Sequence, residues 1–200
     1  MQLNHVNRRG HRYYIFQGQT KTGRPKYFAS KKVTSEKGEP IDSLPEEFEI
    51  FENPSNATVT VRRRKPERVL PGERELVERL TLGLSAYSVV RTISDGDQIV
   101  IYTPDTDPVA AALALERIFG PGTSKLSEST AQHGYYSAEM RFTLLDDHSD
   151  VTNQRCWCAE RYCHRGSIDD WIPLGGPAPL EPLVRKYVGH LGRESLYELI

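Results

Sequence analysis

Long apolar runs are missing from this sequence. The longest unbroken stretch of apolar residues is the seven from Val109 to Leu115, whereas a helix that crosses a bilayer needs roughly 18 or more. The N-terminal residues (MQLNHVNRRGHRYY) also lack the apolar stretch of a secretory signal. We therefore expect no membrane partner for this protein.

Cysteine is scarce, with three residues that all lie between Cys156 and Cys163. An odd number in so short a segment does not make a disulfide framework, so we expect a reducing, cytoplasmic compartment. The sequence also contains no G-x-S-x-G, Walker A, G-x-G-x-x-G or H-E-x-x-H motif. These absences favour a non-enzymatic protein without a cofactor.

Acidic residues are absent from the first 35 positions, and Glu36 is the first. Residues 1–70 carry 14 Lys and Arg against 8 Asp and Glu, a net charge of +6. Residues 71–200 carry 12 against 19, a net charge of −7. The overall charge of −1 thus combines two segments of opposite sign, and such an asymmetry points to a charged partner.

The N-terminal segment is predicted to form two β-hairpins. Residues 11–17 and 26–30 are aromatic and β-prone, and they flank a turn that contains Gly and Pro. Residues 48–52 and 57–64 flank Asn-Pro-Ser-Asn, which is typical of a turn. We expect a small antiparallel β-module over residues 1–65.

After a linker at residues 66–71, the pattern becomes partly helical. Leucines at positions 76, 80 and 84 predict an amphipathic helix, and Asp107-Pro108 is a typical start for a second helix. Four β-prone runs and a C-terminal helix complete an α-β-β-α-β-β-α order over residues 72–200. The predicted class is α+β, with a four-stranded antiparallel sheet in this second domain.

Aromatic and basic residues alternate in the first predicted hairpin. Aromatic rings stack on unpaired bases and cations neutralise phosphates, so this composition indicates a nucleic-acid interface. The second strand of the next hairpin adds basic residues. The candidate binding residues are Arg12, Tyr14, Phe16, Lys21, Arg24, Lys26, Tyr27, Lys31, Lys32, Arg62 and Arg64.

Other interpretations of the basic segment stay open. Half of the aromatic residues are expected to point into a core, and Lys and Arg also protect exposed strand edges from aggregation. Alternatively, the basic half docks on an acidic protein surface, including the acidic half of a second copy. A protein-interaction or homo-oligomeric module is therefore the first alternative.

The C-terminal third holds the remaining candidate groups. Cys156, Cys158, Cys163 and His164 are potential zinc ligands, but two cysteines at i and i+2 of a strand stand about 6.6–6.8 Å apart, too far for one ion. We therefore expect structural cysteines and no metal.

An enzyme with a pocket around His164, Asp169 and Asp170 is the second alternative.

Overall fold

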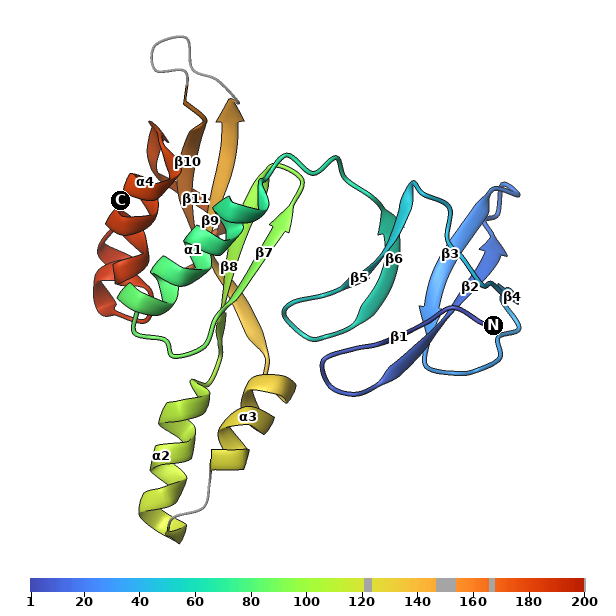
Figure 1. Cartoon of the computed structure of the whole chain (residues 1–200), viewed down its shortest axis with the longest axis horizontal. Coiled ribbons are helices and arrows are strands. Elements are labelled where there is room, and N and C mark those ends of the chain that lie inside the picture. The colour runs from blue at the N-terminus through green and yellow to red at the C-terminus, as the bar shows by residue number, and fades with distance from the viewer. Residues whose placement is uncertain (121–123, 147–153, 166–167, 200) are drawn as a thin grey trace. The chain divides into compact units, whose positions relative to one another are not determined.

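The computed structural model describes residues 1–120, 124–146, 154–165 and 168–199. It contains helices together with antiparallel sheets, so the protein belongs to the α+β class. The chain forms two compact units, Met1–Lys65 and Pro66–Ile200, which we call unit 1 and unit 2 (Figure 1). Each unit is described on its own below.

Unit 1 is built from short strands around the central strand β2. The strands are β1 (Asn4–Val6), β2 (Arg12–Gln19), β3 (Pro25–Ser30), β4 (Glu39–Pro40), β5 (Phe48–Glu52) and β6 (Val59–Arg63). Strand β2 pairs with β3 along one edge, and with β1 and β4 along the other. Strands β5 and β6 form a separate two-stranded sheet. Both hairpins expected from the sequence, β2–β3 and β5–β6, are present.

Strand β2 is buried on both of its faces. Ile15 and Phe16 are 0% exposed, although neighbouring residues in a strand point to opposite faces. The ring of Phe16 stacks on that of Phe28, with centroids 5.5 Å apart. On the opposite face of the hairpin, the ring of Tyr27 lies 4.7 Å from that of Phe48. Several of the aromatic residues in the basic segment are therefore core residues.

A polar network joins the turn between β1 and β2 to strand β5 and the turn after it. The Arg8 guanidinium donates to the Glu52 carboxylate at 3.3 Å and to the carbonyl oxygen of Asn53 at 3.2 Å. The buried Asn7 amide donates to the carbonyl oxygen of Ala57 at 2.7 Å. These bonds satisfy polar groups that would otherwise be costly to bury, and they hold the two sheets of unit 1 together.

Unit 2 is a five-stranded antiparallel sheet in the order β11-β10-β9-β8-β7. The strands are β7 (Arg91–Asp95), β8 (Gln98–Pro104), β9 (Tyr136–Asp146), β10 (Cys156–Arg165) and β11 (Ile168–Ala178). The α-helices are α1 (Pro71–Leu84), α2 (Pro108–Phe119), α3 (Ser124–His133) and α4 (Leu180–Tyr187), followed by 3₁₀ turns η1 (Val188–His190) and η2 (Glu194–Glu198). Among the described residues, no helix is long and apolar enough to cross a bilayer.

Helices α1 and α4 pack together against one face of this sheet. Helix α1 contacts β7 and β8, helix α4 contacts β10 and β11, and the two helices contact each other (Figure 1). The core between them contains Trp157, Phe142 and Met140 from the sheet and Val77 and Val184 from the helices, all of them 0% exposed. The core of unit 2 therefore lies on this one side of the sheet.

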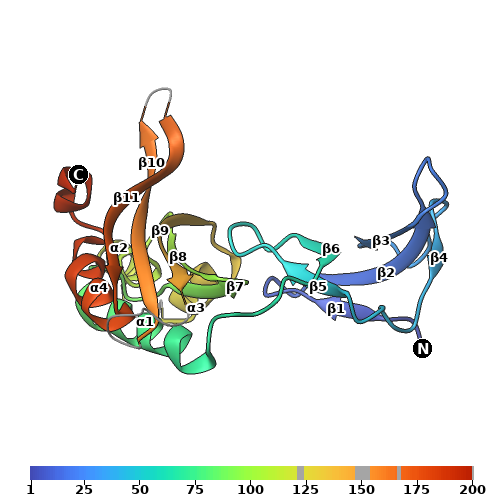
Figure 2. The same cartoon turned by 90° about the horizontal axis from the view of Figure 1, so that it is seen from above.

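The arrangement of unit 2 differs from the predicted one in having a fifth strand, β11, and an additional helix, α3. Strand β11 contains Gly175, Gly176 and Pro177, which are more typical of a connector than of a strand. In the structure β11 is an edge strand that pairs only with β10, where a proline removes no hydrogen bond from the interior of the sheet. The β10–β11 hairpin extends beyond the other strands (Figure 2), since β9 pairs with β10 only as far as Arg161.

The segment expected as a linker, residues 66–71, contacts unit 2 through its central residues. The backbone N–H groups of Arg68 and Val69 donate to the carbonyl oxygen of Gly96, at 2.9 and 3.3 Å. The side chain of Val69 is 4% exposed and belongs to the core of unit 2. Pro71 already begins helix α1, so the segment is largely a part of unit 2.

Candidate nucleic-acid interface

Backbone pairing between β2 and β3 decides which candidate residues share a face. Phe16 lies opposite Phe28, Tyr14 opposite Ser30 and Gly18 opposite Lys26, so all of these lie on one face of the hairpin. On this face Phe16 is completely buried, which leaves its ring unable to contact a nucleic acid. Phe28, which was not among the predicted candidates, is half-buried instead.

Three exposed cations cluster at the turn of the hairpin: Lys21, Arg24 and Lys26. The backbone N–H of Thr20 donates to the Arg24 carbonyl at 2.8 Å, and the Arg24 N–H donates to the Thr20 hydroxyl at 3.0 Å. Gly23 has φ +77°, a conformation that favours glycine. In the described part of the chain, no carboxylate forms an ion pair with any of the three cations.

Three further candidates lie at the other end of the hairpin. The Lys31 ammonium is 5.6 Å from the centroid of the Tyr13 ring and 3.4 Å from Nδ1 of His11. Arg12 donates to the side-chain oxygen of Asn4 at 3.1 Å. Lys32 is exposed at the end of β3. No carboxylate in the described part of the chain pairs with any of these three cations, so their positive charge is not cancelled.

The two candidates from the other hairpin differ from each other. Arg62 donates to the Glu49 carboxylate at 2.7 Å, and its guanidinium lies 3.7 Å from the centroid of the Phe51 ring. Its charge is therefore balanced within the β5–β6 sheet. Arg64 follows β6 and is exposed. Arg64 thus suits a phosphate contact better than Arg62 does.

A cavity of about 620 Å³ lies beside β3, between that strand and the loop that follows it. Its lining includes the half-buried Phe28 and two exposed lysines, Lys32 and Lys37. The full set of lining residues is Phe28, Ala29, Ser30, Lys32, Thr34, Ser35, Glu36 and Lys37. The sequence predicts strands that end at residue 30 and resume at residue 48, and it marked neither Lys37 nor the three hydroxyl groups as candidates.

Two glycines allow the loop to lie against β2. A Cβ atom on Gly38 would lie 2.6 Å from the carbonyl oxygen of Gln17, and one on Gly18 would collide with the carbonyl oxygen of Lys37. Only residues without a side chain permit such an approach of two backbones. In the sequence, this pair of glycines is the only indication that the loop lies against β2. The indication can be recognised only when the loop and β2 are known to be neighbours.

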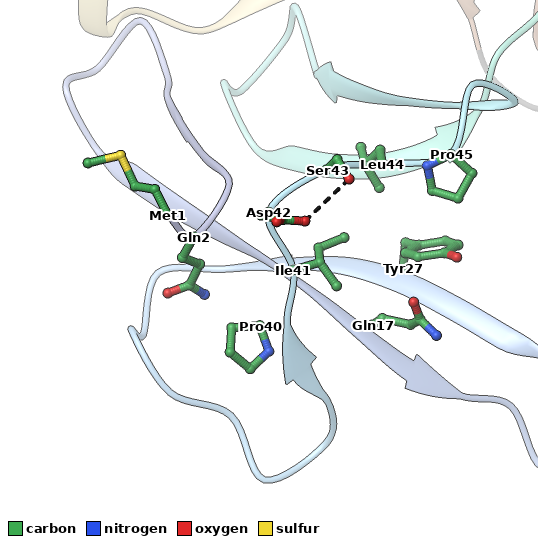
Figure 3. A pocket seen from close by; sticks show the side chains of 10 residues that line it. All are labelled: Met1, Gln2, Gln17, Tyr27, Pro40, Ile41, Asp42, Ser43, Leu44 and Pro45. Atoms are coloured by element: carbon green, nitrogen blue, oxygen red, sulfur yellow. Dashed lines mark hydrogen bonds between the residues drawn. The ribbon is translucent and has the colours of Figure 1, made fainter.

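A second cavity of unit 1, of about 700 Å³, has a different chemistry (Figure 3). Tyr27, Pro40, Ile41, Leu44 and Pro45 form much of its lining, together with polar residues that include Asp42, which accepts a hydrogen bond from Ser43 at 3.3 Å. No lysine or arginine side chain lines this cavity. Tyr27 therefore faces a hollow that no lysine or arginine lines, rather than the cationic surface.

The cysteines do not gather around a common point. Cys158 and Cys163 are five residues apart in β10 and so point to opposite faces of the sheet. Burial, reinforced by the carboxylate of Glu160, raises the pKa of the Cys158 thiol, which makes the metal-binding thiolate less accessible. Within the described residues there is no group of three His, Cys, Asp or Glu side chains that could hold a metal ion. The side chain of His164 lies outside that description.

The residues of the enzyme hypothesis lie on the β10–β11 hairpin. Backbone pairing sets Asp169 opposite His164 and Asp170 opposite Cys163, so Asp169 and Asp170, as neighbours in a strand, point to opposite faces. Both aspartates are exposed, and Asp170 accepts a hydrogen bond from the backbone N–H of Trp171 at 2.7 Å. The structure therefore does not bring these two carboxylates together in one site.

The sheet face opposite the helices of unit 2 carries a polar and aromatic cluster. Glu160 accepts hydrogen bonds from Arg141 at 2.6 and 2.8 Å and from the Thr143 hydroxyl at 3.0 Å. The Arg141 guanidinium also lies 4.4 Å from the centroid of the Trp171 ring, which meets Tyr162 edge-on at 5.1 Å. The hydrogen bond from Arg141 lowers the pKa of the Glu160 carboxyl, although burial acts in the opposite direction.

This molecule is an α+β protein with a cationic β-hairpin in its first unit. No protein-family model, curated protein or solved structure matches the chain.

Proposed function

We propose that unit 1 binds nucleic acid through the cationic surface of the β2–β3 hairpin. The observation that supports this proposal is the group of exposed cations on one hairpin, Lys21, Arg24, Lys26 and Lys32, which pair with no carboxylate in the described part of the chain. Phosphates attract such cations and release counterions when they bind. The proposed activity is binding, with no chemical step.

Four other cations of the protein contrast with this group because each is paired with a carboxylate. Arg8 and Arg62 of unit 1, and Arg141 and Arg155 of unit 2, each contact a carboxylate at 2.6–3.3 Å. Those four arginines stabilise the fold and carry little free charge. The hairpin cations have no such structural role, and mutual repulsion at the turn would be relieved by a polyanion.

The test is the affinity of the full chain for a labelled oligonucleotide across a salt series. We expect affinity to fall steeply with salt, with a log–log slope of about −0.7 to −0.9 for each phosphate neutralised. The variant Lys21→Gln/Arg24→Gln/Lys26→Gln should bind weakly and lose roughly 2–3 units of that slope. The three substituted side chains are exposed, so the variant should keep the wild-type fold.

A second triple variant controls for net charge. Arg74→Gln/Arg79→Gln/Arg185→Gln removes the same charge from helices α1 and α4 of unit 2, and it should bind as the wild type does. Absence of binding at low salt, or equal weakening in both triple variants, would overturn the proposal. Self-association that disappears in the hairpin variant, without any oligonucleotide binding, would support docking on an acidic protein surface instead.

A further inference from the structure

The cavity between β3 and the loop after it combines an aromatic ring, cations and hydroxyl groups. One face of the Phe28 ring is taken by Phe16, whose ring is 5.5 Å away at an interplanar angle of 17°. Phe28 is nevertheless only half-buried and lines the cavity of about 620 Å³. A ring that is held from behind by a buried neighbour is a rigid platform for a second flat ring.

Two lysines flank this platform. Lys32 and Lys37 both line the cavity, both are exposed, and neither pairs with a carboxylate among the described residues. Lys26 lies two residues before Phe28 in β3, so it shares the face of Phe28 and stands about 6.6–6.8 Å away along the strand. The ring is thus set in a row of cations, which would follow a phosphate backbone.

Hydroxyl groups complete the lining of the cavity. Ser30, Thr34 and Ser35 are among its residues, and the hydroxyls of Ser30 and Ser35 accept hydrogen bonds from the backbone N–H groups of Lys32 and Lys37 at 3.1 and 3.2 Å. These bonds fix the two oxygens, which keep their own hydrogen atoms for donation. Fixed hydroxyl donors suit the acceptor atoms of a base, a sugar or a phosphate.

We propose that this cavity holds one unpaired nucleotide of a single-stranded nucleic acid, with its base on Phe28 and its phosphate between Lys32 and Lys37. The inference rests on the proposed nucleic-acid binding of unit 1. A duplex is disfavoured because each base inside it is already stacked on both faces, whereas an unpaired base is free to stack on an aromatic side chain. The volume lies within the range of about 300–1,000 Å³ usual for ligand pockets.

Glu36 gives the proposal its sharpest test. It is the one acidic residue in the lining of the cavity, and it is exposed, so it repels a phosphate held by the two lysines without having a role in the core. Glu36→Gln should therefore strengthen single-strand binding by a few-fold. Glu75→Gln, a distant change on helix α1 that removes the same charge, is the control. If no phosphate lies near Glu36, the two variants should change the affinity for the single strand equally.

The experiment compares a single-stranded oligonucleotide with a duplex of the same sequence. The wild type should prefer the single strand, and Phe28→Leu should weaken that binding by roughly 5- to 150-fold, the loss expected for one stacked base. Duplex binding should change less than about twofold, since stacking makes no contribution there. Phe28→Tyr keeps an aromatic ring and should retain the affinity of the wild type.

Two patterns of results separate the inference from the proposed function. In the first pattern, single strand and duplex bind equally, and Phe28→Leu and Glu36→Gln affect neither, but the variant Lys21→Gln/Arg24→Gln/Lys26→Gln weakens both. This result would refute nucleotide binding in the cavity and would leave the proposed nucleic-acid binding of unit 1 intact. No binding of either form would refute both. If Phe28→Leu disturbs the fold, Lys32→Gln/Lys37→Gln takes its place, since both side chains are exposed, and it should weaken single-strand binding at least tenfold.

Discussion

The rings of Phe16 and Phe28 stack across the β2–β3 hairpin with their centroids 5.5 Å apart. They are direct partners in the strand pairing, yet Phe16 is 0% exposed and Phe28 is half-buried. One ring of the pair therefore lies in the core of unit 1 and the other lies at its surface. Substitution of Phe16 should lower the stability of unit 1, whereas substitution of Phe28 should weaken ligand binding.

Phe16→Ala should destabilise unit 1 by about 3–5 kcal/mol, the usual loss for a buried phenylalanine. Both tryptophans, Trp157 and Trp171, belong to unit 2, so tryptophan fluorescence does not follow this unfolding. Amide hydrogen exchange of β2 and β3 measures it directly. Fast exchange confined to unit 1 is expected, and an unchanged exchange rate in β2 would contradict the assigned burial.

The approach of the loop to β2 predicts a second loss of stability. Gly38→Ala would set a Cβ atom 2.6 Å from the carbonyl oxygen of Gln17, which is backbone and has little freedom to move. We expect a cost of about 1–3 kcal/mol, seen as faster hydrogen exchange in β4 and the end of β2. Gly72→Ala on helix α1 is the control, because nothing lies within 4 Å of its Cβ position; it should be neutral or stabilising by up to about 1 kcal/mol.

Local patterns predicted much of the fold. The hairpins β2–β3 and β5–β6 have alternating or β-prone residues around a turn, and both the strands and the turn are short-range features. Helix α2 begins after Asp107, whose side chain accepts hydrogen bonds from two backbone N–H groups at 3.0 and 2.9 Å, and it ends at Gly120. Strand β11 was missed because Gly175 and Gly176 are allowed there by tertiary packing that local sequence does not show.

The candidate site was predictable in composition and not in detail. An excess of cations among aromatic residues identified the hairpin, but alternation alone does not tell which face of β2 is buried when both are apolar. Phe16 was therefore predicted to be a binding residue, and Phe28 was not. Lys37 was missed because its place beside Phe28 depends on the approach of the loop to Gly18, a contact between segments about 20 residues apart.

The Arg141–Glu160 contact predicts a pH-dependent stability of unit 2. The hydrogen bond from Arg141 holds the pKa of the Glu160 carboxyl below its ordinary value. A group whose pKa is lowered by folding stabilises the fold at pH above that ordinary value, and its contribution is lost as the pH falls through the folded-state pKa. Glu160→Gln should therefore cost roughly 1–2 kcal/mol at neutral pH, and the difference from the wild type should narrow in acid.

Urea unfolding followed by tryptophan fluorescence, repeated across pH, measures this effect. Glu75→Gln, an exposed change on helix α1, should leave the free energy of unfolding close to that of the wild type throughout. A constant difference between Glu160→Gln and the wild type from neutral to acid pH would show that the carboxylate's charge is not the source of its stabilisation.

The packing of β11 on helix α4 predicts a coupled pair of substitutions. The Tyr187 hydroxyl donates to the carbonyl oxygen of Leu174 at 2.7 Å, and a Cβ atom on Gly175 would collide with that hydroxyl. Tyr187 is 3% exposed, so its ring has little room to move aside. Gly175→Ala should cost about 1–3 kcal/mol, and Tyr187→Phe about 1–2 kcal/mol because it leaves a carbonyl oxygen without its donor.

The double variant Gly175→Ala/Tyr187→Phe distinguishes this collision from a general sensitivity of β11. Removal of the hydroxyl makes space for the added methyl group, so the double variant should be more stable than the sum of the two single losses implies, by about 1 kcal/mol or more. Gly83→Ala on helix α1 is the control, since its Cβ position has nothing within 4 Å. Strict additivity in urea unfolding would mean that the methyl group and the hydroxyl do not meet, and that the path of β11 beside helix α4 differs from the one described.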